Sequence, residues 1–103
     1  MPEVREASTV DVQARIRHLE QKRGDLWSIA GGSKSAANIY RAFLDGRRSP
    51  SDASLAMAAF EGFDLMDRYR HLLAEKLTRA AIAKAQAKCL TDEIRRLRVG
   101  DAP

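Results

Sequence analysis

The longest periodic stretch of the chain is residues 64–98, which read DLMDRYRHLLAEKLTRAAIAKAQAKCLTDEIRRLR. Its apolar side chains recur at steps of three and four, the spacing that gathers them on one side of an α-helix. These residues are Leu73, Leu77, Ala80, Ala83, Ala87, Leu90, Ile94 and Leu97. An unbroken helix of this length would measure about 50 Å, which exceeds the diameter of a small domain. We therefore expect either a break near residues 88–92, which would give a helical hairpin, or packing against another chain.

Packing against another chain predicts a homodimer in which residues 64–98 are the oligomerisation element. The small alanine side chains at the centre of the stripe would let a second helix approach closely. The residues expected at the dimer interface are Leu73, Leu77, Ala80, Ala87, Leu90, Ile94 and Leu97.

Composition places the 103 residues in one folded domain, because 45% of them are hydrophobic and 31% are charged. Only 6% are aromatic, so we expect a light core built from helices. No apolar run approaches the ~18 residues of a membrane span, and no membrane association is expected. The single cysteine, Cys89, excludes an internal disulfide and favours a cytoplasmic protein.

The net charge of +4 is concentrated late in the chain, where residues 79–98 carry most of the excess Lys and Arg. A smaller basic pair, Arg47 and Arg48, lies beside an expected turn. Clustered basic residues can bind a polyanion. They are also common on solvated faces and near helix C-termini, so an acidic partner is compatible with the charge but not required by it.

Glycines divide the first 63 residues into four expected helices, at about 9–23, 25–30, 33–45 and 50–61. The start of the fourth is the most sharply marked, with Ser49 as N-cap and Pro50 in the first helical position. The predicted fold is therefore all-α. It is a compact four-helix globule over residues 1–63, then a long helix or hairpin over 64–98 and a tail over 99–103.

A polar stripe marks the third expected helix as a candidate DNA-contacting element. Lys34, Asn38 and Arg41 fall at i, i+4 and i+7, apart from the apolar residues of the same helix. Lys, Asn and Arg are the side chains that bind phosphates and base edges, and Arg47 and Arg48 would follow on the loop. An ordinary amphipathic helix also has a polar side, and this alternative remains open.

The segment IYRAFLDGRRSPS at residues 39–51, followed by Leu55-Ala56 and AFEGF at 59–63, resembles the Cro and phage-repressor type of helix-turn-helix protein. The resemblance covers residues 24–64. It implies a helix-turn-helix-like globule that binds double-stranded DNA. The residues that it assigns to DNA contact are Lys34, Ser35, Asn38, Arg41, Arg47 and Arg48.

Catalytic and metal-binding residues are not expected, and neither is a cofactor. His18 and His71 lie far apart in the chain, without a neighbouring cysteine pair or carboxylate cluster. Asp64 and Asp67 are interpreted as helix-capping residues. The sequence GGSK at residues 31–34 lacks both the spacing of a phosphate-binding loop and the strand that precedes one. We therefore expect a binding protein and not an enzyme.

Two functions remain. The favoured one is a dimeric, sequence-specific transcriptional regulator of the phage-repressor or antitoxin type. The alternative is a small helical adaptor or chaperone-like protein that binds a protein partner through its long helix. Exposure of Lys34, Asn38 and Arg41 on a convex surface that a dimer repeats would favour DNA, whereas burial or a position facing a groove would favour a protein partner.

Overall fold

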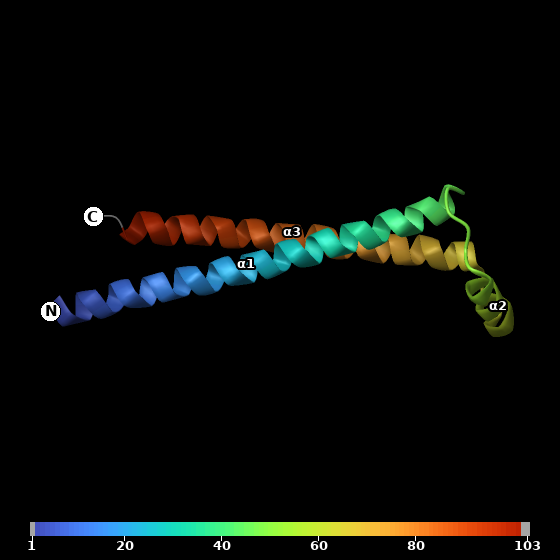
Figure 1. The fold of residues 1–103 in the computed structure, drawn as a ribbon. Coiled ribbons are helices and arrows are strands. Elements are labelled where there is room, and N and C mark those ends of the chain that lie inside the picture. The colour runs from blue at the N-terminus through green and yellow to red at the C-terminus, as the bar shows by residue number, and fades with distance from the viewer. Residues whose placement is uncertain (1, 102–103) are drawn as a thin grey trace.

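The computed structural model describes residues 2–101, which form a long helical hairpin (Figure 1). Helix α1 spans Pro2–Leu44, α2 spans Asp52–Glu61 and α3 spans Leu65–Asp101. Helices α1 and α3 run antiparallel, and the short α2 lies at the closed end (Figure 1). The radius of gyration is 21.8 Å, against about 13 Å for a compact domain of this size. The all-α class is confirmed, whereas the compact four-helix globule is wrong.

Helix α1 passes without interruption through Gly24, Gly31 and Gly32, where the sequence predicted helix ends. These glycines are exposed, and a Cβ atom added at any of them would meet nothing within 4 Å. Each glycine costs about 1 kcal/mol of helix stability relative to alanine. The apolar side chains before and after them pack on α3, and this packing holds the segment helical despite that cost.

The side of α1 that faces α3 follows a regular alternation of four-residue and three-residue steps. An alternation of this kind keeps one stripe aligned along two helices that wind around each other. Every member is buried or half-buried. The stripe consists of Val12, Ile16, Leu19, Arg23, Leu26, Ala30, Ser33, Ala37, Tyr40 and Leu44.

Helix α3 carries the matching stripe and is one helix, with no break near residues 88–92. The stripe consists of Tyr69, Leu73, Lys76, Ala80, Ala83, Ala87, Leu90, Ile94 and Leu97, all buried or half-buried. Its partner is α1 of the same chain, whose own stripe packs against it. The stripe is therefore covered within the chain, and the expected homodimer through it stays a prediction. The predicted tail is also helical as far as Asp101, and residues 102–103 lie outside the described part of the chain.

The seam between α1 and α3 changes character along its length. At the open end of the hairpin, which is the end away from α2, Ile16, Leu19 and Ile94 form a buried aliphatic cluster. In the middle, Ala37 and Ala87 have no exposed surface, so the two helices approach closely there. At the closed end the ring of Tyr69 stacks on Phe43, with 4.6 Å between ring centroids. Bulky ends therefore flank a middle section built from small residues.

Ion pairs across the open end fit the antiparallel arrangement. Arg15 donates to Glu93 at 2.8 Å, and Arg98 pairs with Glu20. Arg23, within the seam, donates to the hydroxyl of Thr91 at 3.3 Å. The ion pairs are largely exposed, so each contributes at most about 1 kcal/mol and serves mainly to favour this pairing of the helices.

Helix α2 begins two residues later than predicted. The hydroxyl of Ser51, and not that of Ser49, accepts a hydrogen bond from the backbone N–H of Ser54 at 3.1 Å. The helix ends at Gly62, whose positive φ of 74° brings its N–H to the carbonyl of Ala58. The sequence located this helix correctly but assigned the wrong N-cap.

The Ser51 cap leads to a local prediction. Ser51→Ala should destabilise α2 by about 1 kcal/mol, because the N–H of Ser54 loses its acceptor. Hydrogen exchange at the amides of residues 55–58 should accelerate. The thermal midpoint of the hairpin should stay the same, since α2 packs only slightly on α3. Ser49→Ala is the matched control and should change neither measurement, whereas equal effects of the two variants would contradict the assigned cap.

Candidate interaction surfaces

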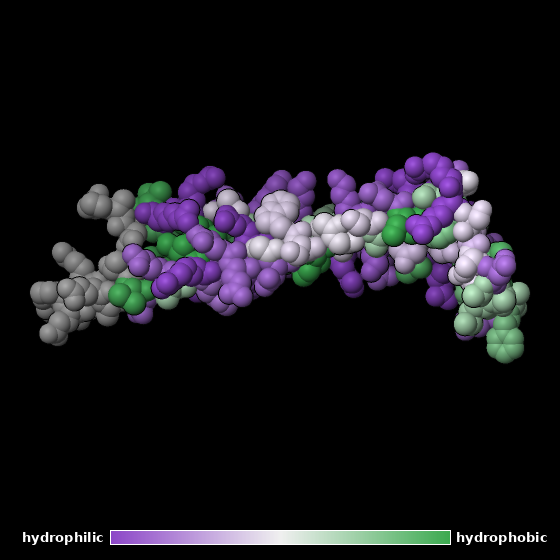
Figure 2. Space-filling view, viewed as in Figure 1, coloured by the Kyte–Doolittle hydropathy of each residue, from purple (hydrophilic) through white to green (hydrophobic). Residues whose placement is uncertain are grey.

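Helix α2 exposes most of its apolar surface. It buries only Ala58, while the side chain of Phe60 is 91% exposed and that of Met57 is 54% exposed. Figure 2 shows apolar colouring over this helix, which projects at the closed end of the molecule. A cavity of about 300 Å³ lies at its base, where Met57, Phe63 and Tyr69 are among the lining residues. An apolar helix left open in this way is typical of a binding site for another macromolecule.

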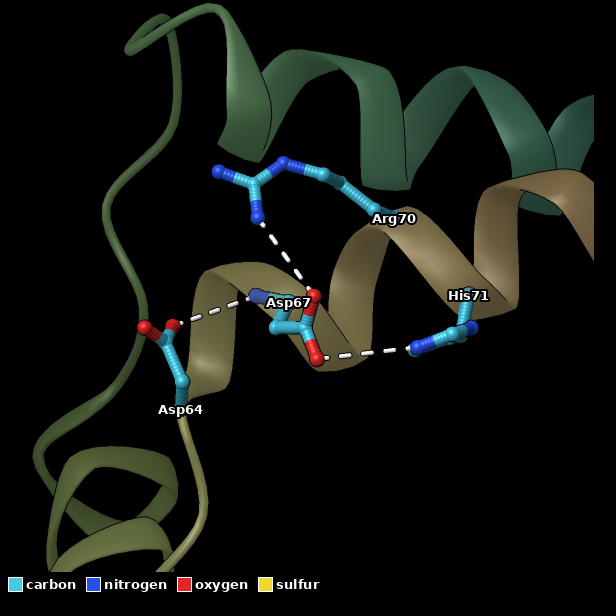
Figure 3. Close-up of polar contacts among 4 residues, drawn as sticks. All are labelled: Asp64, Asp67, Arg70 and His71. Atoms are coloured by element: carbon cyan, nitrogen blue, oxygen red, sulfur yellow. Dashed lines mark hydrogen bonds and ion pairs between the residues drawn. The ribbon is translucent and has the colours of Figure 1, made fainter.

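Polar contacts define the start of α3, which follows α2 in the chain (Figure 3). The carboxylate of Asp64 accepts the backbone N–H of Asp67 at 3.1 Å, which caps the helix. The carboxylate of Asp67 in turn lies 3.6 Å from Arg70 and 3.5 Å from His71. The predicted capping role of Asp64 is confirmed. These contacts are made at the surface and orient the chain as it enters α3.

A groove runs along one side of the hairpin between α1 and α3. Its main section has a volume of about 710 Å³, with Leu26 and Ile29 on α1 opposite Ile82 on α3. A second section of about 330 Å³ continues it and shares Leu26 and Gln86 as lining residues. Ile29 and Ile82 remain 47% and 54% exposed. The groove therefore presents aliphatic side chains that nothing in the hairpin covers.

Polar side chains lie at the two ends of this groove. Glu75 lines one end, where its carboxylate is 3.9 Å from the guanidinium of Arg79. Lys22 lines the other end, together with Cys89. Cys89 is exposed.

The residues expected to contact DNA are all exposed. Lys34, Ser35, Asn38 and Arg41 lie on the solvent-facing part of α1. Lys34, Asn38 and Arg41 share one side of that helix, as their spacing predicted. The two loop arginines follow in the turn after α1. Arg47 pairs with Asp45 at 3.2 Å, and the guanidinium of Arg48 lies 5.5 Å from the ring centroid of Phe43.

The local architecture around these residues differs from the expected one. Residues 24–44 belong to one continuous helix, so the two short helices and intervening turn that the resemblance implies are not formed there. The polar stripe instead lies along the flank of a long hairpin.

The residues expected at a dimer interface lie mostly in the seam within the chain. Ala87 and Ile94 are buried, and Leu73, Ala80, Leu90 and Leu97 are half-buried. Leu77 is the exception, because its side chain is 40% exposed and stands outside the seam.

Two exposed apolar positions were missed by sequence reasoning. Ile82 falls just off the periodic stripe of α3, and Phe60 lies on the short helix α2. Seven of the ten residues of α2 are apolar, and its polar residues are Asp52, Ser54 and Glu61. This composition was a usable signal, since a helix at the end of a narrow hairpin cannot bury all of its sides.

Among the described residues, no three His, Cys, Asp or Glu side chains are grouped so that they could hold a metal ion. Within the same part of the chain, no helix combines the length and apolar character that crossing a membrane requires. Comparisons with known protein families, with characterised proteins and with solved structures find no match to this chain.

Proposed function

We propose that this protein is a helical interaction protein that binds a partner protein through α2, with the α1/α3 hairpin as the stalk. The observation that carries the proposal is the 91% exposure of Phe60 on a helix that buries only Ala58. Burying one large apolar side chain contributes about 1.5–3 kcal/mol. Aromatic anchors of this kind dominate the binding energy of many protein interfaces.

The composition of α2 favours a protein partner over a lipid surface. Helices that lie on membranes carry Lys and Arg on their polar side. Helix α2, with the sequence DASLAMAAFE, contains no basic residue and has a carboxylate at each end, Asp52 and Glu61. Anionic lipid headgroups would repel these carboxylates. A protein pocket with an apolar floor is the better complement.

Site-specific photocrosslinking in cells tests this proposal. A benzophenone amino acid at position 60 should give a discrete adduct of higher mass, because Phe60 would lie inside the partner's pocket. The same amino acid at position 99 is the matched control, since Val99 is 69% exposed but far from α2.

Excess Phe60→Asp protein should not compete for this adduct, whereas excess unmodified protein should. An absence of adducts at position 60 beyond those at position 99 would refute binding through α2.

A second candidate function is sequence-specific binding of double-stranded DNA as a transcriptional regulator. The specific observation in its favour is the common exposure of Lys34, Asn38 and Arg41 on one side of α1, close to the exposed Arg47 and Arg48. Such a surface offers donors to phosphates and to base edges together.

Salt-dependent binding assays test the DNA-binding candidate. Asn38→Ala should weaken specific binding by about 1–3 kcal/mol and leave the salt dependence nearly unchanged, because an amide contacts bases and releases no counterion. Arg47→Ala should weaken binding to all sequences alike and reduce the salt slope by about one unit. A failure to bind DNA at low salt, or unchanged binding after Lys34, Asn38 and Arg41 are all replaced by alanine, would exclude this candidate.

A further inference from the structure

The isolated hairpin exposes more surface than a protein of its mass usually does. Its accessible surface is 7700 Å² for 11.5 kDa, whereas a compact monomer of this mass exposes about 5,800 Å². The excess of about 1,900 Å² exceeds the ~800 Å² per partner of a standard interface. Among the large side chains described, only Ile94 is fully buried. A second copy that covers one side of the hairpin would supply the missing burial.

The groove between α1 and α3 has its centre on α3 at Ile82. The residues of α3 that line the two sections extend from Ala74 to Leu90, over about 24 Å of helix. Ile82 is the midpoint of this range and has one of the more exposed aliphatic side chains of the hairpin. A two-fold axis joins the same patch on both subunits, so a residue at the centre of the patch meets its own copy.

The charges at the ends of the groove are self-complementary about that centre. Glu75 lies at one end and Lys22 at the other. A two-fold axis at Ile82 that sets the two α3 helices antiparallel would bring the carboxylate of each copy over the ammonium group of the other. Opposite charges at the margin favour this orientation over a parallel one, in which like charges would meet.

We propose that two copies of this chain associate through the α1/α3 groove, about a two-fold axis at Ile82, to form an antiparallel four-helix assembly. This interface differs from the seam expected from the periodic stripe, which α1 fills within each chain. It is also independent of α2. The two α2 helices then point to opposite ends of the assembly, and each stays free for a partner.

Analytical ultracentrifugation tests the interface. The unmodified protein should sediment as a dimer at tens of micromolar. Ile82→Asp should weaken dimerisation at least about thirtyfold, because it places two carboxylates at an apolar axis. Helical circular dichroism should stay unchanged, since Ile82 is 54% exposed in the single chain. Leu77→Asp is the matched control on the same helix and should remain dimeric.

Disulfide trapping tests the position of the axis. In a Cys89→Ser background, Ile82→Cys should form an intermolecular disulfide under mild oxidation, because cysteines beside a two-fold axis can approach within bonding reach. Asp92→Cys in the same background lies away from the axis and should not. Glu75→Lys and Lys22→Glu should each weaken the dimer, and the two changes together should restore it.

Several outcomes would overturn the proposal. These are a monomeric unmodified protein, a dimer that Ile82→Asp leaves intact, trapping at position 92 in place of 82, or a failure of the double charge exchange to restore association. Phe60→Asp should leave the dimer unchanged, so the failure of this interface and the failure of binding through α2 are distinguishable.

Discussion

Replacing Ile94 with alanine is expected to lower the free energy of unfolding by about 2–5 kcal/mol. Ile94 is 2% exposed and packs with Ile16 and Leu19 at the open end. The truncation removes buried methyl groups and leaves a cavity that two long helices cannot easily close. A domain of this size has about 5–15 kcal/mol of stability, so the substitution should remove a large fraction of it.

Urea denaturation followed by circular dichroism measures this loss. Val99→Ala is the matched control, because Val99 lies on the same helix but is 69% exposed. It should change the free energy of unfolding by no more than about 0.5 kcal/mol. If Ile94→Ala were as mild as Val99→Ala, the alignment of α1 against α3 at the open end would be wrong.

Enlarging Ala87 to leucine is the second substitution with a large expected effect. Ala87 has no exposed surface and lies in the middle section, where α1 and α3 approach closely. The three additional carbon atoms must push the helices apart or take a strained rotamer, which costs about 1–3 kcal/mol, and more where the backbone cannot move. The packing of α1 against α3 should loosen on both sides of position 87.

The same denaturation experiment measures this loss, and amide exchange in residues 23–30, which lie opposite Ala87, reports the loosening. Ala14→Leu is the matched control, because Ala14 is exposed on α1 and leucine is nearly as good a helix former as alanine. An Ala87→Leu variant as stable as the unmodified protein would show that the middle of the hairpin is not closely packed.

The long C-terminal helix was predictable because its apolar residues follow an uninterrupted period from Leu73 to Leu97. Helix α1 was not, since three exposed glycines and the polar seam residues Arg23 and Ser33 hide the same period. Local signals indicated helix ends at Gly24 and Gly31. They were overridden by packing against a helix more than thirty residues away in the chain, and single-helix patterns carry no information about such a partner.

The candidate surfaces were predictable in part. The exposure of Lys34, Asn38 and Arg41 followed from helical spacing alone, which separates a polar side from an apolar one. The exposure of Phe60 could not be predicted in this way, because the sequence shows that a side chain is apolar but not whether the fold has room to bury it. Ile82 posed the same difficulty, since the groove that it lines forms only when α1 lies alongside α3.

The alanine-rich middle of the seam has a consequence for how far one helix can slide along the other. The side chains of Ala30, Ala37, Ala83 and Ala87 are all small and offer no shape that fixes one alignment, so the middle of the seam does little to oppose a shift of one helix along the other. The register is therefore set by the aliphatic cluster at one end and the stacked rings of Phe43 and Tyr69 at the other. These two ends hold α1 and α3 in one alignment. Loss of the packing at either end would make it easier for one helix to slide along the other.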